Sequence, residues 1–208
     1  MNFELLKLTT MLLGEGSVSL NKKGGIVKFT NTSEELKQFF KELAESQGYK
    51  VKIKDAKNQV IYSTELAKML IKKCKNFRRR SFNKNGKKVY SITIFPSEIF
   101  SLPLEKLKEI LRIYFTCEGG VVIGSDIRND EVIVRICHPI LCKQFLELLY
   151  KVNIEAKVRG RGLIYIRKRS EIVKFAKEIG FIEDVKAVRG KHKGTEKNEL
   201  LIFVLNRH

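Results

Sequence analysis

The chain has few acidic residues, few cysteines and no long apolar segment, and each shortage excludes a class of protein. Of its 208 residues, 23 are Asp or Glu against 41 Lys or Arg, which leaves a formal net charge of +18. So large an excess of positive charge favours a polyanionic partner over a neutral ligand. The alternative is a solvated, lysine-rich surface of the kind found in thermophile proteins, and composition alone leaves that alternative open.

No apolar run approaches the roughly 20 residues that span a bilayer, so we expect no membrane segment. The apolar N-terminus contains Glu4 and Lys7 and lacks a small-residue cleavage site, which argues against a signal peptide. The four cysteines are scattered and predict free thiols in a cytoplasmic protein. Cys137, His138 and Cys142 lack the short paired spacing that is typical of a zinc site.

What the chain does contain is one pattern, written twice. An apolar helical segment ends in an acid next to glycine, with Glu15 in the first copy and Glu118, 103 residues later, in the second. The corresponding segments are 8–18 and 111–121, 36–40 and 141–145, 60–62 and 163–165, and 64–66 and 170–172. Their offsets drift by only three residues, which indicates two copies of one unit with small loop insertions. Such a twofold unit can bring two carboxylates together at a central axis.

Each copy is predicted to form a helix, two strands, a helix, two strands and a helix. The first helix, over residues 3–13, is apolar on most of its circumference and should therefore be buried. The second helix should end at Gly48, with Asn153 as its counterpart, because both residue types accept a left-handed backbone. The third helices are predicted to begin at Thr64 and Ser170 as N-caps.

Two predicted strands place basic residues on one face. Lys50, Lys52 and Lys54 alternate with apolar residues in the first copy, as do Lys157, Arg159 and Arg161 in the second. A repeated basic face favours a surface for phosphates, although an edge strand protected by lysine is the alternative. With Lys28 and Arg167, these residues form the candidate nucleic-acid-binding set.

The pattern divides the chain into four segments. They are a first repeat at 1–75, a linker at 76–102, a second repeat at 103–181 and a C-terminal extension at 182–208. Residues 76–90 carry six basic residues and no acid, and Asn85-Gly86 predicts a hairpin tip. The pattern weakens after Phe181, where residues 200–205 are compatible with an edge strand.

The two segments that end in Gly14-Glu15-Gly16 and Cys117-Glu118-Gly119 resemble the paired motifs of the LAGLIDADG homing endonucleases. Residues 163–165 and 172–181 also resemble that family's strand and third helix, and the resemblance covers most of residues 3–181. It implies an α+β monomer built from two αββαββα repeats related by a pseudo-twofold axis. The motif helices would lie side by side, and two curved antiparallel sheets would form a saddle across the major groove of double-stranded DNA.

The resemblance implies that Glu15 and Glu118 are the catalytic acids and the metal ligands. Phosphodiester cleavage of this kind uses divalent ions, here Mg²⁺ or Mn²⁺, and Mg²⁺ often takes only one or two carboxylates with water and phosphate. Lys168, near a lysine that family enzymes often carry, is the candidate for stabilising developing charge. The alternative is a solvated lysine within the basic run 167–169.

Two pairs of positions depart from the family pattern. Thr10 and Ile113 stand five residues before the acids, where the motif helices usually carry small residues, chiefly glycine. This predicts helices that are either more widely spaced or crossed at a different angle. Leu13 and Thr116 replace the aspartate that is often found two residues before the acid.

Two functions of this fold therefore stay open, besides the alternative of an unrelated repeat protein with a basic surface. The first is a site-specific, metal-dependent endonuclease that breaks both DNA strands. The second is a protein that uses the same saddle without cleaving, either a DNA-binding regulator or a splicing factor that binds structured RNA. Retention of both acids favours the enzyme, because a pure binder gains nothing from carboxylates that face phosphates.

Overall fold

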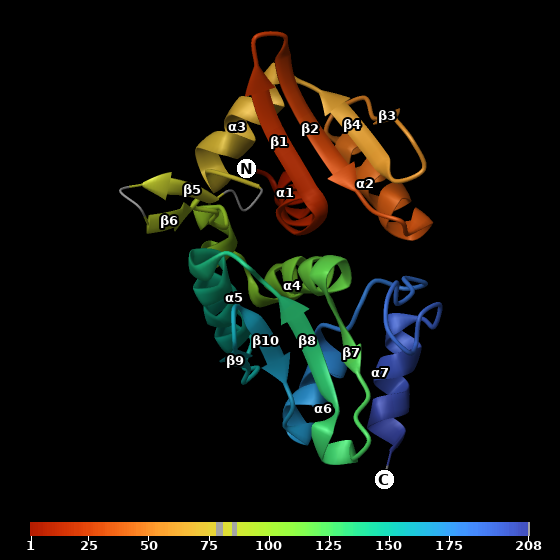
Figure 1. Cartoon of the computed structure of the whole chain (residues 1–208). Helices are drawn as coiled ribbons and strands as arrows, with labels where there is room; N and C mark the ends of the chain where they lie inside the picture. Colours follow the sequence, from red (N-terminus) through yellow and green to blue (C-terminus); the bar gives the residue numbers. More distant parts are fainter. Residues whose placement is uncertain (78–80, 85–86, 208) are drawn as a thin grey trace.

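The protein's structure, a computed structural model, describes residues 1–77, 81–84 and 87–207 and contains the same seven-element unit twice (Figure 1). The first unit comprises α1 (Phe3–Glu15), β1 (Gly16–Asn21), β2 (Gly24–Thr30), α2 (Glu34–Ser46), β3 (Lys52–Ile53), β4 (Asn58–Tyr62) and α3 (Thr64–Cys74). The second comprises α4 (Leu104–Glu118), β7 (Gly119–Val122), β8 (Glu131–Arg135), α5 (Pro139–Lys151), β9 (Lys157–Arg159), β10 (Leu163–Ile166) and α6 (Arg169–Glu178). The predicted α+β fold with two αββαββα repeats is confirmed.

The remaining elements lie outside these units. Between them, β5 (Ser81–Lys84) and β6 (Lys87–Tyr90) pair as an antiparallel ribbon, and a 3-10 helix (Ser97–Ser101) leads into α4. The predicted hairpin tip Asn85-Gly86 lies outside the described residues. A second 3-10 helix (Ile127–Asn129) stands between β7 and β8, and α7 (Lys197–Asn206) ends the chain. No helix in the described part of the chain is long and apolar enough to cross a membrane.

The edge strand considered for residues 200–205 is wrong, because this segment belongs to helix α7. Its buried residues are Leu200, Leu201 and Val204. They recur at the spacing of one helical face and not at the period of two that a half-buried strand requires.

Each unit contains a four-stranded antiparallel sheet, in the order β1-β2-β4-β3 and β7-β8-β10-β9. Gly16 pairs with Phe29, which pairs with Gln59, whereas Gly119 pairs with Val134, which pairs with Ile164. Gln59 therefore corresponds to Ile164, at an offset of 105. The same offset relates the first residues of α3 and α6. The sequence match of 60–62 with 163–165 is thus two residues out of register, because the β7–β8 connection is longer than the β1–β2 turn.

One face of each sheet is covered by helices and the other is open. Along β2, Val27 and Phe29 are buried while the alternating residues Ile26, Lys28 and Thr30 are partly exposed. Phe29 stacks on Phe40 of α2 with ring centroids 4.7 Å apart. In the second unit, Phe115 of α4 contacts Phe145 of α5 and Phe175 of α6, at 5.3 and 4.7 Å. Figure 1 shows α1 and α4 in the middle of the molecule, between the two sheets.

The ends of the predicted helices are only partly correct. Gly48 and Asn153 follow α2 and α5 with φ angles of +78° and +58°, as predicted. The N-caps were misplaced, because Ser63 caps α3 by accepting from the Leu66 amide while Thr64 accepts from the Gly25 amide instead. Ser170 lies inside the first turn of α6, and the helix begins after Lys168, which makes no side-chain cap.

Candidate nucleic-acid interface and acid pair

The first helices of the two units, α1 and α4, pack against each other, and Gly14 of α1 lies against Cys117 and Glu118 of α4. A methyl group on Gly14 would lie 2.9 Å from Cβ of Cys117 and 3.3 Å from Cγ of Glu118. The glycine therefore permits a backbone approach that no other residue type fits. Thr10 and Ile113, which predicted a wider spacing, are both buried, and the Thr10 hydroxyl donates to the Leu6 carbonyl of its own helix at 2.8 Å. The acid-bearing ends are in close contact despite these larger residues.

Glu15 and Glu118 are the last residues of α1 and α4, and both line a single cavity of about 600 Å³. The cavity also takes Lys28 and Thr30 from β2 and Arg135 from the end of β8. Its other lining residues are Leu13, Gly14, Gly16, Phe77, Tyr114, Cys137 and His138. One acid from each repeat thus faces the same space.

Burial disfavours the charged forms of both acids in this cavity. Burial raises the pKa of Glu15, and the charges of Lys197 and Arg189 oppose that rise. Burial, followed by the negative charge of Glu15, raises the pKa of Glu118 to about 7, again against Lys197 and Arg189. The negative ends of two helix dipoles add to the same potential. A cation placed between the carboxylates would therefore be stabilised.

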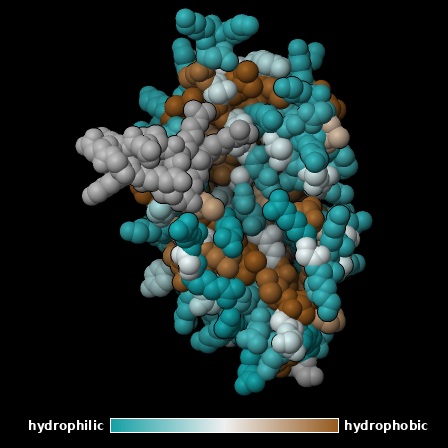
Figure 2. Space-filling view, in the orientation of Figure 1, coloured by the Kyte–Doolittle hydropathy of each residue, from teal (hydrophilic) through white to brown (hydrophobic). Residues whose placement is uncertain are grey.

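Basic residues project from the open faces of both sheets. The strand pairing puts Lys52, Val60 and Lys28 in one row across the first sheet. It puts Lys157 opposite Tyr165 in the second sheet. Residues directly opposite in an antiparallel pair share a face, so Lys28 and Lys52 stand on one surface of their sheet. Figure 2 shows hydrophilic side chains along both halves of the face seen in Figure 1, with apolar residues between them.

Comparison with known proteins identifies this architecture. Residues 2–101 match the family model described as a LAGLIDADG-like domain. The chain has the two-repeat LAGLIDADG fold. No curated protein matches the sequence.

Three solved structures are similar to this chain over most of their length. I-DmoI in complex with DNA and Mn is 14% identical with a TM-score of 0.56, over 86% of this chain and 97% of that one. I-WcaI bound to its DNA recognition sequence is 13% identical with a TM-score of 0.54, over 88% and 84%. The N-terminal LAGLIDADG domain of DUF199/WhiA is 13% identical with a TM-score of 0.54, over 87% and 84%. At such low identities the likeness establishes the fold.

The carboxylates of Glu15 and Glu118 can supply two oxygen ligands to a divalent ion, with water and phosphate as the remaining ligands. The described residues contain no group of three or more His, Cys, Asp or Glu side chains that could hold a metal. Two carboxylates are nevertheless what Mg²⁺ often receives from a protein, the other ligands being water and phosphate oxygens. I-DmoI has been solved with DNA and Mn and with DNA and Ca. The donor set here fits Mg²⁺ or Mn²⁺ shared with a phosphate.

The side chain of Lys197 binds the C-terminal end of α4. This residue of α7 is only 6% exposed, and its ammonium donates to the carbonyls of Thr116 and Gly119 at 2.6 and 2.7 Å. These carbonyls flank Glu118 at the end of α4, where helical partners run out. Burial lowers the pKa of Lys197, and the acids Glu15 and Glu118 oppose that shift. Sequence reasoning missed this residue because no spacing links the extension to the second motif.

Two of the predicted DNA-binding arginines already have partners. Glu131 of β8 is 2% exposed and accepts from Arg159 at 2.9 and 2.7 Å and from Arg167 at 2.7 Å. Both guanidinium groups also lie over the Tyr165 ring, at 4.9 and 5.5 Å. These arginines are therefore held in place on the sheet. The sequence contained no signal for Glu131, because nothing marks which acid will be buried under a basic face.

The basic strand predicted over residues 50–54 is shorter than expected. Only Lys52–Ile53 forms β3, and Lys50 and Lys54 are exposed residues on either side of it. Ile53 is 74% exposed, although it stands opposite Gln59 on the face that the helices cover. Ile53 is exposed because β3 is an edge strand and the helices do not extend over it. In the second repeat, Arg161 is exposed in the turn between β9 and β10.

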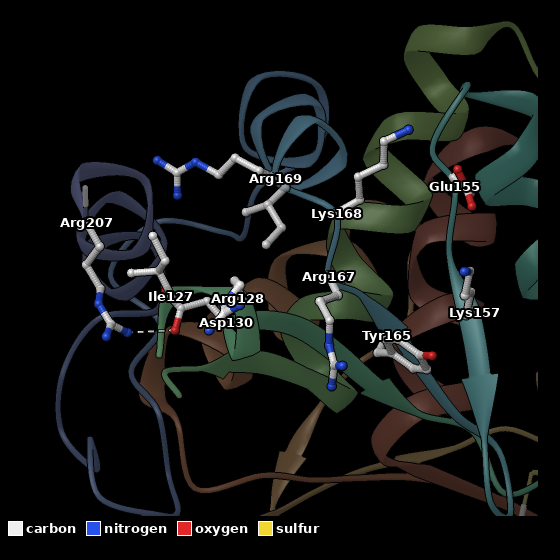
Figure 3. A pocket seen from close by; sticks show the side chains of 11 residues that line it. Ile127, Arg128, Asp130, Glu155, Lys157, Tyr165, Arg167, Lys168, Arg169 and Arg207 are labelled. Carbon is white, nitrogen blue, oxygen red and sulfur yellow. Dashed lines mark hydrogen bonds and ion pairs between the residues drawn. The ribbon is translucent and has the colours of Figure 1, made fainter. Parts of the chain in front are cut away.

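Lys168 is not among the residues that line the acid cavity. It lines a separate cavity of about 640 Å³ at the far end of the second sheet, with Lys157, Tyr165 and Arg167 (Figure 3). With the offset of 105 set by the strand register, Lys168 corresponds to Ser63, the N-cap of α3, in the first repeat. Lys28 and Arg135, of which only Lys28 was predicted as a site residue, are the basic residues that share the cavity with Glu15 and Glu118.

Replacing Glu118 with glutamine is expected to stabilise the metal-free protein at pH 8 but not at pH 5. The pKa of Glu118 in the folded protein, about 7, is above its ordinary value of 4.5. The folded state therefore holds its proton more tightly, and this stabilising contribution is lost as pH rises through 7. At pH 8 the wild type carries a half-buried charge that costs roughly 2 kcal/mol after allowance for solvent screening.

Urea unfolding at both pH values, without divalent ions, measures this difference. Glu147→Gln, an exposed change on α5, is the matched control and should show no pH-dependent gain. Equal effects of Glu118→Gln at pH 5 and pH 8 would contradict the electrostatic interpretation.

Proposed function

We propose that this protein is a site-specific, metal-dependent endonuclease that cuts both strands of a DNA duplex. The observation that carries the proposal is the single cavity lined by Glu15 and Glu118 where the two LAGLIDADG helices meet. A duplex has an approximate twofold relation between its strands, and so have the two acids. One carboxylate from each repeat can then serve the pair of phosphates that a double-strand break requires.

Binding would use the open faces of both sheets. Duplex DNA carries one negative charge per ~1.7 Å of axis, and the chain has a formal net charge of +18. Lys28, Lys52 and Lys157 project from these faces, and I-DmoI and I-WcaI, which share the fold, were solved with DNA. Because both repeats belong to one chain, we propose that a monomer suffices.

Each group in the cavity has a distinct role in this proposal. Glu15 and Glu118 would hold Mg²⁺ or Mn²⁺, and the bound ion would act as a Lewis acid and lower the pKa of a coordinated water. The contact between Gly14 and Cys117 fixes the carboxylates relative to each other. Lys28 and Arg135 stabilise the negative charge that develops on the phosphate, a role first considered for Lys168. Lys197 holds the end of α4, and so orients Glu118.

A LAGLIDADG protein that binds without cleaving is the second candidate. One observation favours it: with a pKa of about 7, Glu118 is partly protonated at neutral pH, which opposes metal binding. Such a protein would be a DNA-binding regulator or a factor that binds structured RNA.

Incubation with a library of duplexes distinguishes the two candidates. With Mg²⁺ or Mn²⁺ we expect a defined subset of sequences to be cut on both strands, and with EDTA none. Structured RNA of matched length is included in parallel binding assays. Tight duplex binding with every sequence left intact, or a preference for RNA, would contradict the endonuclease proposal.

Replacing Lys50, Lys52 and Lys54 together with alanine is expected to weaken duplex binding and reduce its salt dependence. Each lost phosphate contact lowers the slope of log affinity against log salt by about 0.9, so the triple variant should lose about 2 to 3 units of slope. The control replaces Lys68 and Lys72 on α3 and Lys143 on α5 with alanine, and these lysines are also exposed. Equal salt slopes for the two variants would show that this edge does not contact the duplex.

A further inference from the structure

The segment between the second repeat and α7 forms a compact basic arm, defined here as residues 186–196. Lys186 and Glu196 pair at its base, and the Ala187 amide donates to the Thr195 carbonyl at 2.8 Å. The Gly194 amide donates to the Ala187 carbonyl at 2.8 Å, which closes the loop. Gly194 has a φ angle of +91°, a conformation that favours glycine. The arm therefore has a defined shape.

The base of the basic arm is fixed to the second LAGLIDADG helix. Lys197 follows the arm directly, and its side chain holds the Thr116 and Gly119 carbonyls at the end of α4. Its amide donates to the Val185 carbonyl at 2.9 Å, so both ends of the arm meet at this anchor. The arm cannot move far from Glu118 without breaking these buried contacts.

The basic arm lies across the junction of the two repeats. Figure 1 shows this blue segment, which precedes α7, at the boundary between the two halves and near the start of α2. Arg189 acts on both acids, opposing the effect of burial on the pKa of Glu15 and of Glu118. On the other side of the junction, the pKa of Glu35 is lowered by a hydrogen bond from Ser33 and also by the charge of Lys186.

The tip of the basic arm carries positive charges that are not paired with acidic side chains among the described residues. Arg189, Lys191 and Lys193 are all exposed. None of them takes part in an ion pair with another of the described residues. This differs from Arg159 and Arg167 on the second sheet, which Glu131 already holds. These three exposed cations, of which Arg189 acts on both acids, are free to meet phosphates.

We propose that the basic arm is a separate nucleic-acid contact, in which Arg189, Lys191 and Lys193 bind backbone phosphates of a DNA duplex from one side of the acid pair. The inference rests on the part of the proposed function that places a duplex over the saddle, and it does not depend on cleavage. Because the arm belongs to the second half alone, it makes the two sides of the bound duplex unequal.

The test compares Arg189→Ala/Lys191→Ala/Lys193→Ala with the exposed control Lys68→Ala/Lys72→Ala/Lys143→Ala, which removes the same charge. Affinity for duplex DNA is measured in EDTA over a series of salt concentrations. The arm variant should bind about 10- to 100-fold more weakly at moderate salt, with a slope smaller by about 2 to 3. Arg189→Lys/Lys191→Arg/Lys193→Arg, which conserves charge, should bind like the wild type.

Three results would overturn the proposal. The first is an arm variant that matches the control in affinity and slope. The second is unchanged affinity with a lower thermal midpoint, which would make the arm a brace between the repeats. The third is a loss of binding confined to a structured RNA hairpin. A wild type that binds no duplex would instead contradict the proposed function itself, so the two failures are distinguishable.

Discussion

Replacing Glu15 or Glu118 with glutamine is expected to reduce Mg²⁺-dependent cleavage by about 10³-fold or more and to leave duplex binding intact or tighter. Glutamine keeps the volume and hydrogen-bonding capacity of the side chain but removes the charge that holds a divalent ion. Loss of several kcal/mol of metal-derived stabilisation in the transition state corresponds to this factor. Binding should survive because one negative charge that faces phosphate has been removed.

The measurement is single-turnover cleavage of the preferred duplex, with binding assayed in EDTA. Glu147→Gln on α5 controls for the loss of one acid far from the cavity. The shared cavity predicts that either change impairs cleavage of both strands. Full cleavage activity in either glutamine variant would show that the replaced acid is not required for catalysis.

Introducing a side chain at Gly14 is the second change with a large expected effect. Gly14→Cys should destabilise the fold by about 2 to 3 kcal/mol, because its Cβ would lie 2.9 Å from Cβ of Cys117 in a packed helix contact. Cleavage should fall as well, since the same contact sets the position of Glu118. Gly120→Cys is the control, because a methyl group there meets no atom within 4 Å.

A swap between the repeats sharpens this test. Gly14 and Cys117 stand at equivalent positions, so Gly14→Cys/Cys117→Gly exchanges the two residues across the axis. The double variant should recover at least about 1 kcal/mol relative to the sum of the single changes, as measured by urea unfolding. Simple additivity would mean that the two residues do not share a contact in solution.

The acids and the order of the elements were predictable because both are repeated in the sequence. Glu15 and Glu118 each end an apolar segment at glycine, and two copies of that pattern leave few alternative folds. Helix ends at Gly48 and Asn153 were predictable for a local reason, since the backbone there requires a left-handed residue.

What could not be predicted depends on contacts between distant segments. A two-residue difference in the β7–β8 connection shifted the matched strands, and with them the expected place of Lys168. A register error of this size cannot be seen without the partner strand. Lys197 and Glu131 act through partners far away in the sequence, the carbonyls of Thr116 and Gly119 and the guanidinium groups of Arg159 and Arg167. Residues 200–205 span fewer than two helical turns, and over so short a segment the spacing of apolar residues does not separate a helix from a strand.

Gly14 and Cys117, which face each other at the axis, also determine whether a half of the molecule can associate with a copy of itself or only with the other half. Two first halves would meet glycine to glycine and leave a gap between their helices, which costs packing energy. Two second halves would bring two cysteine side chains into a space that one fills. Each half is therefore shaped for the other and not for a copy of itself. Halves expressed separately should reassemble as mixed pairs, and the single chain joins two partners that are no longer interchangeable.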